Sequence, residues 1–174
     1  GMQSTRPSTA RMVLDLEGPV EYRIRRAEGN NDLVLEIPHQ VTGVLFEDRE
    51  GQKAVHIKTT GPVEYETFSL RDPERIVVDL KNVVPGAGLP DSVEVASSTV
   101  KRIRAALFQA EPPVTRVVID LAEPAHYHVT PTFNGITVHF DAWITGVKVE
   151  KAEGKLRLVF ATTQRVVPEV KTAE

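Results

Sequence analysis

The sequence predicts an all-β protein, organised as a β-sandwich of two small sheets, and three observations support this. Most apolar segments alternate with polar residues at a period of two, which is typical of strands that bury one face. Charged turns that contain glycine separate these segments, as in "EDREGQ" and "EKAEGK". The hexapeptide "RIVVDL" (75–80) has close copies in "RMVLDL" (11–16) and "RVVIDL" (116–121). Short strands need a second sheet to cover their apolar face, which favours a sandwich.

The predicted strands follow one another with short connections. Besides the hexapeptides, they lie near residues 42–47, 52–59, 63–70, 100–108, 125–130, 135–140, 144–150, 155–162 and 165–171. The tripeptide "FNG" (133–135) predicts a tight hairpin, and "NVVPGAGLPDS" (82–92) predicts a loop or irregular crossover. The segment "STVKRIRAALFQ" (98–109) suits a helix by propensity, but its β neighbours favour a strand, which we adopt.

The chain also contains an internal repeat with an offset of 103–105 residues. The matching segments are 11–22 with 116–127, 41–51 with 144–154, and 58–66 with 161–169. We therefore expect four parts: a loose, tag-derived stretch at 1–9, the closing half of one unit at 10–38, a complete unit at 41–140, and the opening half of another unit at 142–174. We expect the two half-units to pack together as a second partial sandwich, within one chain or exchanged between two chains in a homodimer.

Composition excludes several classes of function. The net charge of −3 gives the chain no general attraction for nucleic acid or anionic lipid. Cysteine is absent, which excludes disulfides, thiol catalysis and thiolate zinc sites. No apolar run approaches the length of a transmembrane helix. Gly1 before Met2 is typical of a cloning remnant, so we expect any signal peptide to have been removed.

Catalytic and metal motifs are weak. The sequence has no H-E-x-x-H or G-x-S-x-G motif, and "PGAGLP" lacks the lysine of a phosphate loop, so we expect neither an enzyme nor a cofactor. His126 and His128 could share a strand face and hold a metal. The repeat has Glu21 and Arg23 at the equivalent positions, which disfavours that site. The remaining histidines (His39, His56 and His139) are expected to be scattered and solvated.

The charged ends of the hexapeptides are the candidate site. Alternation places Arg75, Asp79, Arg116 and Asp120 on the outer face, with positions two, four and six of each hexapeptide buried. On this basis Val77 is expected to face outward, unlike Val78. Arg75 and Asp79 lie about 13 Å apart along a strand and cannot pair with each other. Each can form a cross-strand ion pair or bind a ligand, and an aspartate that orients an arginine allows both.

One run of segments carries a family resemblance. The order "TTGPVEYETFSLRDPERIVVDLKN", "VKRIRAALFQAEPPVTRVVIDLAEPAHYHV" and "NGITVHF" resembles an AMIN domain, over residues 41–140 and in part over the flanking halves. AMIN domains are non-catalytic modules of periplasmic N-acetylmuramoyl-L-alanine amidases, and they also occur in type IV pilus secretins. The segment "IRAALF" departs from the glycine- and glutamine-containing strand often seen in the family.

The resemblance implies a periplasmic peptidoglycan-binding module that localises its parent protein at the cell wall. The binding residues would then be Arg75, Asp79, Arg116 and Asp120. The alternative is a protein-interaction scaffold whose exposed strand edges add strands to envelope-machine subunits of a pilus or secretion assembly. Tandem half-units favour a secretin over an amidase as the parent. Neither reading involves nucleic acid or insertion into a membrane.

Overall fold

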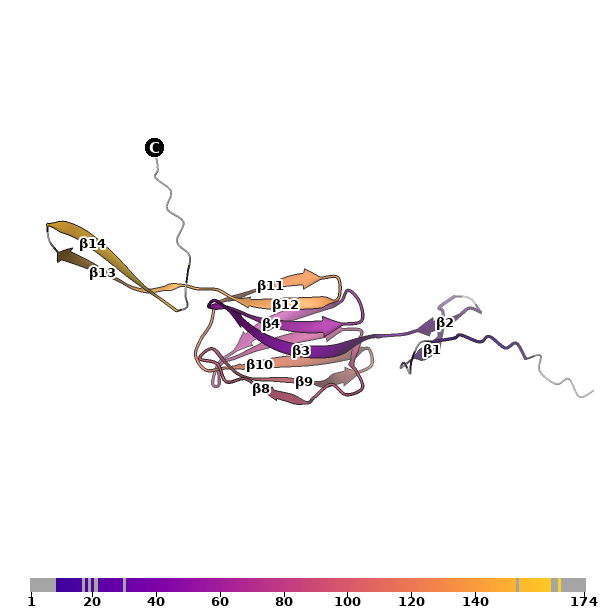
Figure 1. The fold of residues 1–174 in the computed structure, drawn as a ribbon. Helices are drawn as coiled ribbons and strands as arrows, with labels where there is room; N and C mark the ends of the chain where they lie inside the picture. Colours follow the sequence, from indigo (N-terminus) through magenta and orange to yellow (C-terminus); the bar gives the residue numbers. More distant parts are fainter. Residues whose placement is uncertain are drawn as a thin grey trace, which may run out of the picture. The chain divides into compact units, whose positions relative to one another are not determined.

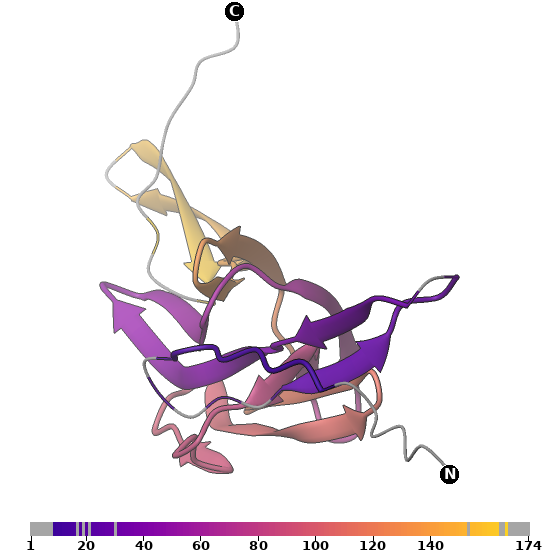
Figure 2. The ribbon, with the colours of Figure 1, turned by 90° about the vertical axis from the view of Figure 1, so that its right-hand side faces the viewer.

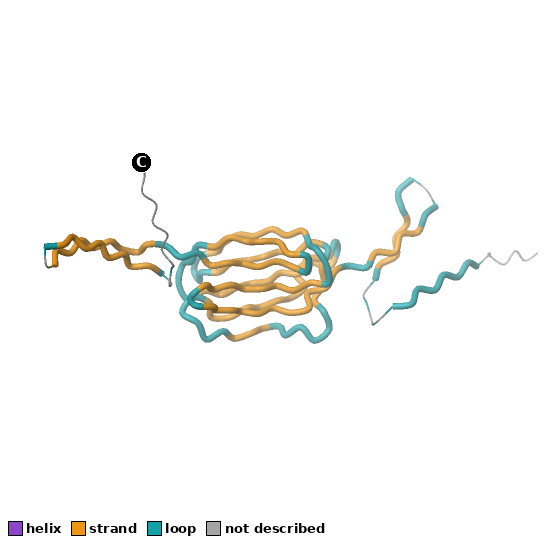
Figure 3. The backbone as a smooth tube through the Cα atoms, turned by 45° about the horizontal axis from the view of Figure 1, so that its top comes forward, coloured by secondary structure: helices purple, strands orange, loops and turns teal. Residues whose placement is uncertain are grey.

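The computed structural model describes residues 9–16, 18, 20, 22–29, 31–152, 154–163 and 166. The chain divides into two compact units, Gly1–Ile37 and Pro38–Glu174. The described residues form strands and no helix, which confirms the predicted all-β class (Figure 3). This part of the chain accordingly holds no helix long and apolar enough to cross a membrane.

The second unit contains a sandwich of two five-stranded sheets (Figures 1 and 2). The first sheet has the order β11-β12-β4-β3-β7, with β3 at His39–Arg49, β4 at Gln52–Thr59, β7 at Val83–Pro85, β11 at Tyr127–Thr132 and β12 at Gly135–Phe140. The second sheet has the order β5-β6-β10-β9-β8, with β5 at Glu64–Leu70, β6 at Arg75–Lys81, β8 at Ser92–Glu94, β9 at Val100–Ala110 and β10 at Pro113–Leu121. Neighbouring strands are antiparallel except β3 and β7, which are parallel.

The core lies between the two sheets and consists of aliphatic residues at alternating strand positions. The hexapeptides on β6 and β10 supply Ile76, Val78, Leu80, Val117, Ile119 and Leu121. This confirms the predicted burial of positions two, four and six in these two copies. The first sheet supplies the opposing layer of Val41, Val55, Ile57, Ile136, Val138 and Phe140. The segment 98–109 contributes Val100, Ile103 and Ala105 from a strand, as predicted.

Val77 corrects one expectation, because it is buried although it belongs to the outer face. Only 2% of its surface is exposed. Its cross-strand neighbours on that face are Phe68 of β5 and Val118 of β10. The side chains of Phe68 and Val118 therefore flank Val77 on the outer face of the sheet.

Two other predicted segments differ from the structure, and a third lies largely outside the described residues. The predicted loop 82–92 includes two short strands, β7 and the start of β8. The hexapeptide 11–16 is not part of a strand, and its apolar side chains are exposed. Apart from Val166, the predicted strand 165–171 lies outside the described residues.

Two further sheets have two strands each. The first unit contains β1 (Arg23–Arg26) paired with β2 (Leu33–Glu36), and the second unit also contains β13 (Ile144–Ala152) paired with β14 (Lys155–Thr162). These are the strands of the two predicted half-units. Packing of residues 10–38 on 142–174 stays a prediction.

The hairpin between β11 and β12 confirms the turn predicted from "FNG". Gly135 has a φ of +133°, and a Cβ atom built on it would lie 2.0 Å from the carbonyl oxygen of Ile57. Glycine is required here for two reasons: the positive φ angle and the close approach of the Ile57 carbonyl on β4.

We predict that Gly135→Ala lowers the free energy of unfolding by about 2–3 kcal/mol, because the new methyl group must push the two strands apart. Gly43→Ala is the matched control, since a Cβ atom at that strand position meets no atom within 4 Å. Chemical denaturation of both variants measures the effect. Equal stability of the two variants would contradict the close approach at Gly135.

We also predict that Val77→Asp destabilises the sandwich by about 3 kcal/mol or more, as a buried unpaired charge does, and so resembles Val78→Asp. Leu45→Asp is the control, because Leu45 also lies on a strand but is 50% exposed. Thermal unfolding followed by circular dichroism compares the three variants. A melting temperature for Val77→Asp close to that of Leu45→Asp would show that Val77 tolerates water.

Candidate functional site

The candidate binding face is the outer surface of the second sheet. The antiparallel register of β6 and β10 sets Arg116 opposite Asp79 and Asp120 opposite Arg75. All four residues of the candidate site therefore lie on one face, in two rows across the strands. The two rows differ in how their charges are paired.

Arg116 and Asp79 form a two-point ion pair in the first row. The Nε and Nη2 atoms of Arg116 each donate a hydrogen bond of 2.7 Å to a different oxygen of Asp79. The carboxylate is largely covered, with 13% of the side chain exposed. The hydrogen bond to Asp79 raises the pKa of Arg116 despite partial burial. This geometry holds the guanidinium in one orientation, since a planar fork matches a carboxylate.

Two phenylalanines flank the guanidinium of Arg116. Its central carbon lies 3.4 Å from the ring centroid of Phe108 and 5.7 Å from that of Phe68. Such stacking adds a cation–π attraction to the ion pair. Phe108 is 56% exposed, so much of its surface remains available to a ligand. It occupies the position where the β9–β10 register shifts, between Leu107 and Gln109, and such bulges commonly re-aim side chains.

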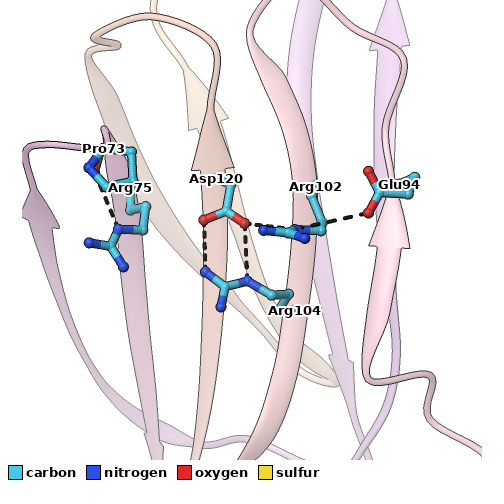
Figure 4. Close-up of polar contacts among 6 residues, drawn as sticks. All are labelled: Pro73, Arg75, Glu94, Arg102, Arg104 and Asp120. Carbon is cyan, nitrogen blue, oxygen red and sulfur yellow. Dashed lines mark hydrogen bonds and ion pairs between the residues drawn. The ribbon is translucent and has the colours of Figure 1, made fainter.

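In the second row, Asp120 is held by β9 and not by its cross-strand neighbour Arg75 (Figure 4). Arg102 donates from Nε at 2.9 Å, and Arg104 donates from Nε and Nη2 at 3.0 and 2.8 Å. Burial of Asp120 opposes its ionisation, but the hydrogen bonds from Arg104 and Arg102 outweigh burial and lower its pKa. Two arginines of β9 thus hold one carboxylate of β10.

Arg75 makes a weaker contact. Its Nε donates to the carbonyl oxygen of Pro73 at 3.2 Å, and in Figure 4 its terminal nitrogens point away from Asp120. The guanidinium therefore keeps donors that a ligand can use. Of the four candidate residues, the two arginines present donors, whereas the two aspartates serve mainly to hold arginines.

Sequence reasoning missed four residues of this face. Arg102 and Arg104 belong to "VKRIRA", where their alternation could have placed them on one face. Phe68 and Phe108 carried no signal, because nothing in their segments indicates that they meet beside Arg116. These four residues come from the strands that flank the hexapeptides.

His56 and His139 lie with His128 on the outer face of the first sheet, which corrects the expectation that these two are scattered, whereas His39 is exposed as expected. His128 and His139 stack with ring centroids 4.8 Å apart, and Nδ1 of His128 lies 2.8 Å from Asp141. Burial, followed by the neighbouring His128, lowers the pKa of His139. His56 lies 3.1 Å from Glu47 through Nε2, and this contact is the main reason that the pKa of Glu47 is lowered.

The two histidines considered as a metal pair have separate partners. The ring of His126 contacts Trp143 edge-on, with centroids 4.3 Å apart, whereas His128 contacts His139 and Asp141. Within the described residues, no three histidine, aspartate or glutamate side chains are grouped so that they could hold a metal ion.

Taken together, the fold and this face define a β-sandwich that presents an open, preorganised surface of arginines and aromatic rings. Comparison with known protein families assigns this sandwich to one family. The profile of the AMIN domain matches residues 43–140, which is more than half of the sequence, and the chain belongs to the AMIN domain family. The match runs from Gly43, inside β3, to the end of β12 and includes the candidate binding face.

Part of the chain is also similar in sequence to an amidase. The N-acetylmuramoyl-L-alanine amidase AmiC of Neisseria meningitidis serogroup B is 34% identical over 76 residues. The aligned stretch covers 42% of this chain and 18% of AmiC. The chain therefore spans less than a fifth of that relative's length.

We predict a pH-dependent effect of Asp120→Asn. Because the folded-state pKa of Asp120 is below its ordinary value of 3.8, its ion pairs stabilise the fold above that pH and are lost as the pH falls through the folded-state pKa. At pH 7 the variant should lose about 1–3 kcal/mol of unfolding free energy. The difference from wild type should shrink below about pH 4.

Denaturation at several pH values measures this difference, with the exposed Asp91→Asn as the control. A gap between wild type and Asp120→Asn that stays constant from about pH 7 to about pH 3 would contradict the ionised state of Asp120.

Proposed function

We propose that this AMIN domain is a non-catalytic peptidoglycan-binding module of a periplasmic envelope protein. It binds the cell wall through the outer face of the second sheet. The family match supports this assignment, as does the relative whose name describes an amidase acting on N-acetylmuramoyl-L-alanine, a unit of peptidoglycan. The observation that carries the proposal is the guanidinium of Arg116, fixed by Asp79 and stacked on the exposed ring of Phe108.

The chemistry of this face suits a polymer of sugars and short peptides. Exposed phenylalanine rings can pack against the apolar side of a sugar ring, and guanidinium groups donate to hydroxyls and to peptide carboxylates. Asp79 and Asp120 act as positioning residues that hold Arg116, Arg102 and Arg104 before the ligand arrives. Less side-chain freedom is then lost on binding.

The binding is expected to be weak at each module and to be strengthened by repetition. The exposed face of a sheet buries only one side of its ligand, but a polymer offers many copies of the same contact. The half-units on either side of the complete domain suit such an array. We place the module in a periplasmic amidase, which the relative supports, or in a type IV pilus secretin, which the repeated half-units support.

We predict that Arg75→Ala combined with Phe108→Ala weakens binding to purified sacculi about tenfold, which is the effect of losing roughly 1.4 kcal/mol of contacts. This pair leaves both aspartate-centred ion pairs intact, whereas removing Arg116 would strand the covered Asp79 and disturb folding. Co-sedimentation with sacculi measures binding, and circular dichroism checks the fold.

The matched control is Lys58→Ala with Leu45→Ala, which removes an exposed cation and an exposed apolar side chain from the first sheet. Wild-type binding by the folded Arg75/Phe108 variant would exclude this face as the binding site. If sacculi do not retain the wild-type protein, the wall-binding function itself is wrong, and the interaction scaffold becomes the better reading.

A further inference from the structure

The hairpin β13–β14 presents an apolar face with no partner among the described residues. Cross-strand neighbours share a face, and here they pair Val147 with Phe160 and Val149 with Leu158. All four side chains are more than half exposed. An isolated two-stranded hairpin is only marginally stable in water, so a face of this kind needs a cover.

This hairpin has the register of β3–β4, shifted by 103 residues. Val147 opposite Phe160 corresponds to Val44 opposite Ile57, and the irregular step at Ile144 and Gly146 corresponds to that at Val41 and Gly43. In the complete domain, the equivalents of Leu158 and Phe160 are the fully buried Val55 and Ile57. In its register, the hairpin β13–β14 therefore repeats the β3–β4 hairpin of the AMIN domain.

The hairpin β1–β2 repeats β11–β12 in the same way. Ile24 pairs with Leu35 as Val129 pairs with Val138, and Arg23 pairs with Glu36 as His128 pairs with His139. Its apolar face is exposed as well, with Ile24 at 62%. In the complete domain β12 pairs directly with β4, so the two hairpins are the two halves of one sheet.

Applying the β12–β4 register to β2 and β14 gives complementary neighbours at each position. The resulting pairs are Leu33 with Phe160, Val34 with Val159, Leu35 with Leu158, Glu36 with Arg157, and Ile37 with Leu156. The leucines, Ile37 and Phe160 all fall on one face. Glu36 and Arg157, with opposite charges, fall on the other face, where such pairs favour strand pairing.

We propose that β2 of one copy of this chain pairs antiparallel with β14 of a second copy, forming a four-stranded sheet in the order β1-β2-β14-β13. This sheet reproduces the order β11-β12-β4-β3 of the complete domain. The hexapeptide 11–16, equivalent to β10, supplies exposed Met12, Leu14 and Leu16 to cover part of its apolar face. The inference does not depend on peptidoglycan binding.

The connections favour a second copy over the same chain. Phe140 is level with Asp48 through Lys53, so β12 ends far along β3 from His39, about 30 Å away by the strand rise. Residues 141–143 contain no turn. Ile37 precedes a proline, which favours extended backbone. Pairing within one chain would need a reversal at both connections, whereas head-to-tail pairing between copies needs none.

Head-to-tail pairing has a definite consequence for assembly. It is a heterologous interface, because β2 of each copy meets β14 of the next, and such an interface continues into open chains unless a rotation closes it. The predicted product is a series of oligomers and not a single symmetric dimer.

Cysteine cross-linking tests the register and the partner together, since the chain has no cysteine of its own. Leu35→Cys and Leu158→Cys in the same chain, treated with oxidised glutathione, should give a ladder of disulfide-linked oligomers on non-reducing gels. Mixing the two single variants should give a cross-linked dimer that stops there, because each copy then carries one thiol.

The control combines Leu35→Cys with Val159→Cys, which lies one residue out of register on the opposite face. A ladder in the first pair and not in the control supports the proposal. A disulfide confined to the monomer would show that the partner is the same chain and would overturn the second copy. Absence of any disulfide, or equal ladders in both pairs, would overturn the β2–β14 register.

Discussion

The antiparallel ladder between β6 and β10 controls both what the second sheet buries and what it exposes. It sets Val117 opposite Val78 on the core side and Arg116 opposite Asp79 on the outer side. Because side chains alternate strictly, a slip of one residue would expose the valines and bury the charges. The core and the ion pair therefore select the same register. The two central strands tolerate opposite charges beside an apolar run for this reason.

The aspartates on this face act through arginines. Asp79 holds Arg116 within the β6–β10 pair, and Asp120 ties β10 to Arg102 and Arg104 of β9. Each carboxylate is mostly covered, and its negative charge is neutralised by the arginines bound to it. The exposed groups of this cluster are therefore oriented guanidinium groups. The guanidinium donors of Arg116, Arg102 and Arg104 are thus held in fixed orientations. Phe68 and Phe108 add apolar area to the same surface.

The two flanking hairpins show that local sequence is sufficient to set a strand pairing. They keep the registers of β11–β12 and β3–β4, including the irregular step at Gly146. Turn length and side-chain alternation are sufficient to set a hairpin register. They cannot bury a face, because burial needs strands from elsewhere. On these hairpins Leu33, Leu156 and Leu158 are accordingly exposed.

The sequence by itself determined the class, most strand positions, the "FNG" turn and the shared face of Arg75, Asp79, Arg116 and Asp120. These follow from a period of two and from turn chemistry, which act over a few residues. Only the tertiary structure decided that Val77 is covered, that Asp120 binds Arg102 and Arg104 in preference to Arg75, and that Phe108 lies over Arg116. These outcomes depend on the register shift beside Phe108 and on the long-range pairing of β6 with β10. The alternation of residues along a single strand specifies neither.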